Sequence, residues 1–115
     1  MSVTTTDRLV RFAEAMGYEL ETDPTKKYPR KGKCVLFERT LIVAGTLEKR
    51  GTRELNPLTN PADAIELAVK MKCAYEYRPR AKGDKYWAWM DPIEHGADDL
   101  CTAICAAVEA ALEAK

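Results

Sequence analysis

The residues of this 115-residue chain that could carry catalysis are few, because it has one histidine and one serine. His95 lies in an Ile-Glu-His-Gly segment that is predicted to be a turn before the last helix. A catalytic base needs a partner within hydrogen-bond reach, and no such partner is evident for His95. Ser2 lies close to the N-terminus, so a serine-histidine-acid triad is not predicted. These residues favour a non-enzymatic protein.

The four cysteines could in principle bind zinc. Cys101 and Cys105 are one helical turn apart, and Cys73 and His95 could complete a ligand set. Structural zinc sites usually contain Cys-x-x-Cys pairs, which this sequence lacks. Cys101 and Cys105 also border an apolar helical stripe, and free cysteine is among the most buried residue types. We therefore predict that all four cysteines, Cys34, Cys73, Cys101 and Cys105, are reduced. We also predict that Cys105 is buried and that there is no metal site.

The remaining chemical signal is a set of basic turns with nearby aromatic side chains. The net charge is zero, but residues 26–85 hold 15 basic and 7 acidic side chains, whereas both flanking segments are acidic. If the turns converge, they would form a phosphate-attracting rim; otherwise the acidic ends neutralise the basic middle. The candidate binding residues are Lys26, Lys27, Tyr28, Arg30, Lys31, Arg50, Tyr77, Arg78 and Arg80. The sequence has neither of the glycine-rich nucleotide-binding motifs, G-x-x-x-x-G-K-[ST] and G-x-G-x-x-G, so no cofactor is predicted.

The elements that must position these residues follow from hydrophobic periodicity and turn signals. They predict the order α-β-β-α-β-β-α in a single domain over residues 1–115. Strands are expected near 34–38, 40–47, 74–78 and 85–90, with a short extended piece near 53–55, and helices near 7–16, 61–72 and 97–114.

An antiparallel four-stranded sheet with three helices is the natural α+β arrangement of these elements. Trp87 and Trp89 share one strand face and are expected to be buried, which favours a three-layer helix-sheet-helix sandwich. No apolar stretch is long enough to span a bilayer, and the N-terminus does not have the pattern of a signal peptide, so a cytoplasmic location is predicted.

Three segments resemble the phage ABA-sandwich domain and the similar NinX-like proteins, which are small bacteriophage proteins of unknown role. They are Met16-Gly17-Tyr18 after the first helix, residues 56–64 entering the second helix, and the strand 86–90 together with Ala103-Ile104-Cys105. The segment 25–53 has no counterpart there. The resemblance implies a phage or prophage origin and a helix-sheet-helix fold, and it carries over no catalytic residues.

Two functions follow as hypotheses. The first is a phage accessory protein in the host cytoplasm that binds a host protein without catalysis, for instance to inhibit a defence system such as CRISPR. The alternative is a protein that binds and sequesters a nucleotide or nucleic acid through the basic turns and exposed aromatics. Both hypotheses leave open whether the protein forms homo-oligomers.

Overall fold

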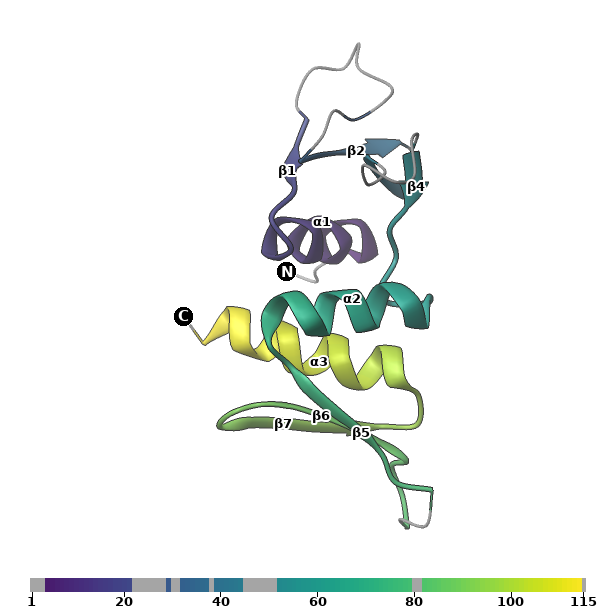
Figure 1. The fold of residues 1–115 in the computed structure, drawn as a ribbon, viewed down its shortest axis with the longest axis vertical. Helices are drawn as coiled ribbons and strands as arrows, with labels where there is room; N and C mark the ends of the chain where they lie inside the picture. Colours follow the sequence, from purple (N-terminus) through teal and green to yellow (C-terminus); the bar gives the residue numbers. More distant parts are fainter. Residues whose placement is uncertain are drawn as a thin grey trace. The chain divides into compact units, whose positions relative to one another are not determined.

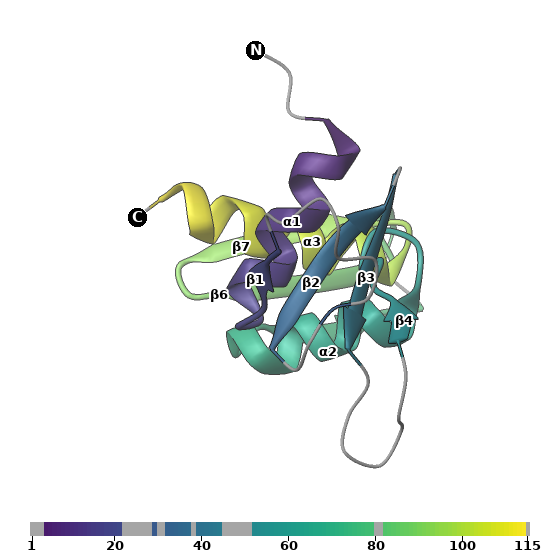
Figure 2. The ribbon, with the colours of Figure 1, turned by 90° about the horizontal axis from the view of Figure 1, so that it is seen from above.

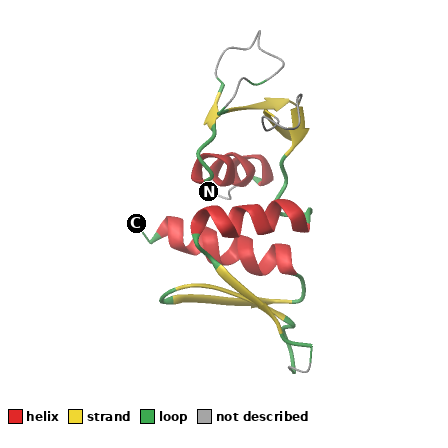
Figure 3. Ribbon diagram, in the orientation of Figure 1, coloured by secondary structure: helices red, strands yellow, loops and turns green. Residues whose placement is uncertain are grey.

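The computed structural model describes residues 4–21, 29, 32–37, 39–44, 52–79 and 82–114. They form an α+β protein with three helices, as predicted (Figure 3). The chain divides into two compact units, residues 1–56 and 57–115. The helices are α1 (Thr5–Ala15), α2 (Pro61–Met71) and α3 (Leu100–Glu113). The strands are β1 (Glu19–Leu20), β2 (Lys33–Phe37), β3 (Thr40–Ala44), β4 (Thr52–Glu54), β5 (Ala74–Tyr77), β6 (Tyr86–Met90) and β7 (Ile93–Ala97).

The first unit is built from α1 and the sheet β1–β4. The Thr4 side chain caps α1 by accepting a hydrogen bond from the Asp7 backbone N–H at 3.1 Å. Leu9, Phe12 and Ala13 recur at helical spacing and are buried, as the sequence predicts. Gly17 follows with φ of +97°, a left-handed conformation in which glycine has no steric cost, and it turns the chain into β1.

The sheet of the first unit has the strand order β1-β2-β3-β4 and is mixed (Figure 2). β2 and β3 are antiparallel, as the predicted antiparallel sheet requires, with Val35 opposite Ile42, and β4 adds to β3 near the expected extended piece. β1 pairs with β2 in parallel, with Leu20 beside Cys34. The prediction of a purely antiparallel sheet is wrong here, because a two-residue strand carries no detectable periodicity. The predicted continuation of β3 to residue 47 lies outside the described residues.

The second unit is built from α2, α3 and a separate antiparallel sheet of order β5-β6-β7. Asn60 caps α2 by accepting from the Ala62 N–H at 3.0 Å, and Pro61 occupies the first turn, as predicted. Both helices lie on the same side of the three strands, with α3 against β6 and β7 (Figure 1). Ala88 and Ala97 are buried on this side of the sheet.

The four predicted strands therefore belong to two different sheets, and the prediction of a single four-stranded sheet with helices on both faces is wrong. The physical reason lies in the neighbours that each hairpin acquires. β2 and β3 are flanked by β1 and β4, so neither has a free edge for a strand of the second hairpin. β6 likewise has β5 on one side and β7 on the other.

The segment around His95 is a strand rather than the predicted turn. Asp91 and Pro92 turn the chain, and β7 pairs with β6 along its whole length, placing His95 opposite Ala88. The last helix consequently begins at Leu100 instead of residue 97. Asp99 is its N-cap, accepting from the Thr102 N–H at 2.8 Å and from the Thr102 hydroxyl at 2.7 Å.

All four cysteines are unbonded and buried, which confirms the predicted burial of Cys105 and core packing of Cys101. Cys105, 1% exposed, places its sulfur 3.4 Å from the Pro57 carbonyl oxygen. Burial raises the pKa of the Cys34, Cys73 and Cys101 thiols, so their reactive thiolate form is disfavoured.

The thiols should therefore react slowly in the folded protein. We expect a thiol reagent such as DTNB to label all four cysteines within its mixing time in denaturant, and to label the native protein at least about tenfold more slowly, limited by opening of the fold. Fast native labelling of all four would contradict this packing.

A second prediction concerns the cap of α3. The Thr102 hydrogen bonds lower the pKa of Asp99, so its contribution to stability is present above the ordinary pKa of 3.8 and is lost as the pH falls through the folded value. Asp99→Ala should lower the free energy of unfolding by about 1 kcal/mol at neutral pH. Asp99→Asn keeps a capping acceptor, so it should cost less at neutral pH and show a weaker loss of stability in acid. Urea unfolding at several pH values measures both effects, and equal acid sensitivity of Asp99→Asn and the parent would contradict the assignment.

Candidate functional site

The face of the second sheet opposite α3 carries the two tryptophans. The register places Glu76 beside Trp87 and Ala74 beside Trp89, while Ala88 points to the helix side. Trp87 and Trp89 were expected to be buried, but both are partly exposed. The correction follows from the alternation of side chains along β6, because burying Ala88 under α3 turns its two neighbours away. We call this surface the tryptophan face: Glu76, Arg78, Trp87, Trp89 and Glu94.

Trp87 is held in one position by contacts on several sides. Its indole Nε1 donates a hydrogen bond to the Asp84 carbonyl oxygen at 3.2 Å. Its neighbour on β7 is Gly96, where an added Cβ would lie 3.1 Å from Trp87 Cε2, so the absent side chain makes room for the ring. The Arg78 guanidinium lies 5.2 Å from the ring centroid, in cation-π range, and Arg78 Nε donates to Glu76 at 3.0 Å.

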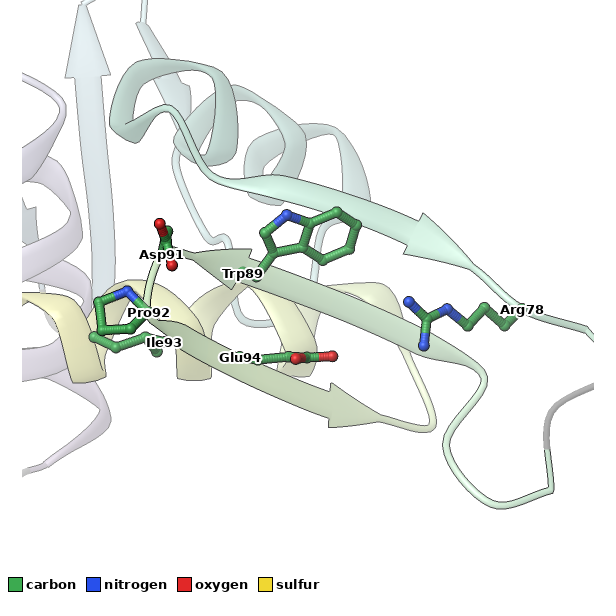
Figure 4. A pocket seen from close by; sticks show the side chains of 6 residues that line it. All are labelled: Arg78, Trp89, Asp91, Pro92, Ile93 and Glu94. Carbon is green, nitrogen blue, oxygen red and sulfur yellow. The ribbon is translucent and has the colours of Figure 1, made fainter.

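Next to this cluster the tryptophan face is hollowed. Figure 4 shows Trp89 above the hollow, Glu94 below it, the Arg78 guanidinium at one end and the β6–β7 turn at the other. The cavity volume is about 230 Å³. The turn residues that line it are Asp91, Pro92 and Ile93.

The charge of the hollow is dominated by carboxylates. Asp91 and Glu94 have no ion-pair partner in the part of the chain that the structure describes. Arg78 is the positive group at the rim, and its charge is already balanced by Glu76. An aromatic wall with two carboxylates suits a cationic side chain, whose charge interacts with both the ring face and the acids.

Two further aromatic side chains lie on the opposite face of β5, at the edge of the sheet. Tyr77 stacks on Tyr86 with ring centroids 4.8 Å apart and an interplanar angle of 26°. Tyr75 and Tyr77 share one face, as predicted, and are 41% and 57% exposed. Exposed tyrosines on an edge strand offer both ring surface and hydroxyl groups to a partner.

The structure describes two of the predicted binding residues. Tyr77 ends β5 and Arg78 follows it, so their side chains leave on opposite faces of the sheet and do not form one site. The other predicted binding residues lie outside the described residues: Lys26, Lys27, Tyr28, Arg30, Lys31, Arg50 and Arg80. Sequence reasoning missed Trp89, Asp91 and Glu94. The Trp-Ala-Trp alternation was the available signal, and it was interpreted as burial.

Among the described residues, no group of three or more histidine, cysteine, aspartate or glutamate side chains is placed to share a metal ion. Within the same residues, no helix has the length and apolar character needed to cross a membrane. No protein-family model, curated protein or solved structure matches the chain.

The packing of Trp87 on Gly96 gives a direct test of this geometry. In Gly96→Ala the new Cβ would lie 2.8 Å from Asp84 Oδ2, 3.1 Å from Asp84 Cβ and 3.1 Å from the Trp87 ring, so the Asp84 side chain must move and the indole is crowded. We expect a loss of about 1–3 kcal/mol in the free energy of unfolding and a shifted tryptophan fluorescence maximum. The same substitution in a Trp87→Phe background should cost less, because the smaller ring relieves the crowding. Equal costs in the two backgrounds would show that the crowding comes from Asp84 alone, and would contradict a contribution of the Trp87 ring.

Proposed function

We propose that this chain acts by binding another protein through the tryptophan face. The observation that carries the proposal is a sheet face with two partly exposed tryptophans, one of which, Trp89, lines a hollow of about 230 Å³. Tryptophan, tyrosine and arginine are the residues that most often dominate binding energy at protein interfaces. Trp87 is already held by Asp84 and Arg78, so binding would cost little additional ordering of its side chain.

The charges of this face favour a protein over a nucleic acid. Glu76, Asp91 and Glu94 outnumber the two cations here, which are Arg78 and the adjacent Lys85. A phosphate backbone would be repelled by this excess of carboxylates, whereas a basic side chain of a protein would be attracted. We therefore infer that the partner presents lysine or arginine to the hollow.

The biological setting rests on the resemblance to small phage proteins. We propose a phage or prophage accessory protein that works without catalysis in the host cytoplasm, where its partner is a host protein. Inhibition of a defence system such as CRISPR is one role of this kind. Interface aromatics and a surface hollow support binding, and they do not distinguish among host targets.

Binding of a nucleotide or nucleic acid is the second candidate. It is supported by exposed Tyr77, which offers a stacking surface, and by the basic residues of the sequence that were predicted to attract phosphate. It ranks second because Arg78, the cation at the rim of the hollow, is paired with Glu76, and the adjacent Lys85 donates to the Pro79 carbonyl oxygen.

The test is affinity capture from bacterial lysate with matched variants. Trp89→Ala and Glu94→Lys should each reduce recovery of a specific protein, and the affinity for the purified partner should fall about 30-fold or more, as expected for a central interface residue. Val69→Ala is the control, because Val69 is 69% exposed on α2 and lies outside the tryptophan face. Circular dichroism verifies that each variant is folded.

The outcome that would reverse the ranking is equally specific. If the retained material is nucleotide or nucleic acid, its affinity should fall steeply with salt. It should also be lost when Lys26, Lys27, Arg30 and Lys31 are replaced by glutamate, and should be unaffected by Glu94→Lys. Tyr28→Ala and Tyr77→Ala would then report on stacking.

A further inference from the structure

The outer edge of β5 is open. Within the described residues β5 pairs only with β6, and all four of its residues are exposed. The Arg78 N–H donates to the Lys85 carbonyl oxygen at 2.7 Å, which continues the β5–β6 ladder one residue past the strand. Backbone groups alternate in direction along a strand. The N–H and C=O of Glu76 therefore also point to β6, whereas the N–H and C=O of Tyr75 and Tyr77 point away from it, to the outer edge. An exposed strand edge of this kind is a template for another strand.

The side chains around Tyr77 show which strand would fit. Glu76 and Arg78 have opposite charges, flank Tyr77 and extend from the same face of the sheet. In an antiparallel pair with a two-fold axis at Tyr77, Glu76 of each copy lies opposite Arg78 of the other. A two-fold interface requires such self-complementarity, because each contact between a residue of one copy and a residue of the other occurs twice, once on each side of the axis.

We propose that β5 pairs with β5 of a second copy of this chain, antiparallel and centred on Tyr77. Tyr77 of each copy exchanges backbone hydrogen bonds with Tyr77 of the other. The Tyr75 N–H of each copy lies beside Pro79 of the other copy, which has no N–H to return a hydrogen bond, so Tyr77 marks the centre and Pro79 the limit of the pairing. The Tyr77 rings then lie side by side and extend the existing Tyr77–Tyr86 stack across the axis. This inference goes beyond the proposed function and does not depend on it.

The pairing would join two three-stranded sheets into one of six strands. An axis perpendicular to the sheet keeps both tryptophan faces on the same side. The contact is short, so the dimer should be reversible and concentration-dependent.

The charges allow a decisive exchange experiment by sedimentation equilibrium over about 10 µM to 1 mM, a range that covers weak association. The parent protein should form dimers as its concentration rises. Glu76→Arg and Arg78→Glu should each weaken dimerisation by about tenfold or more, since like charges then face one another across the axis. An equimolar mixture of these two variants should associate again, because each arginine now meets a glutamate of the other copy. Native mass spectrometry should identify the heterodimer by its mass.

Neither variant can form the Glu76–Arg78 ion pair within one copy. Recovery of dimerisation in the mixture would therefore come from ion pairs between copies and not from restoring that internal pair. Val69→Arg, on the exposed side of α2 and outside the tryptophan face, is the control and should leave dimerisation unchanged. A parent protein that stays monomeric throughout the range would overturn the proposal. So would single variants that dimerise like the parent, or a mixture of weakened variants that does not recover.

Discussion

The packing of α3 on β6 and β7 is the constraint on which the candidate surface depends. Ala88 and Ala97 are buried on the helix side, where small side chains allow a helix rich in alanine to approach the strands closely. Side chains alternate along a strand, so burying Ala88 turns Trp87 and Trp89 to the other side. A shift of one residue in register would bury both indoles and expose the alanines. The tryptophan face is thus a direct consequence of how the core of the second unit is packed.

Once the tryptophans face away from the helix, their surroundings determine what they can bind. Gly96 leaves space beneath Trp87, and Asp84 and Arg78 hold the indole from the side and from above the ring. Glu76 balances Arg78, which leaves Asp91 and Glu94 to set the sign of the hollow beside Trp89. The surface therefore combines an aromatic group with negative charge, and this combination is the basis for proposing a partner of positive charge rather than a polyanion.

Much of the local structure could be predicted from the sequence, and most of the tertiary arrangement could not. Leu9, Phe12 and Ala13 mark α1, and Asn60-Pro61 marks the start of α2, because caps and periodicity act within a few residues. The assignment of the two hairpins to one sheet failed because sheet partners are chosen by tertiary packing. β1 is too short to show a pattern. The Ile-Glu-His-Gly segment was interpreted as a turn and residue 97 as the start of the last helix, whereas both belong to β7. For the same reason the hollow was missed, since it depends on the fold of β7 against β6.

The second sheet has two edges that differ in character. β7 forms one edge, and β5 forms the other with two exposed tyrosines and two opposite charges about Tyr77. Proteins commonly protect an edge with proline or with charges of one sign; here Pro79 limits the open part of β5, and the charges alternate. Alternation is favourable to a strand with the same sequence running in the opposite direction. If two copies pair there, each presents its tryptophan face on the same side of the joined sheet, so a partner with two basic segments would be bound at both hollows. The effective concentration of the second contact would then increase the affinity without any change in either hollow.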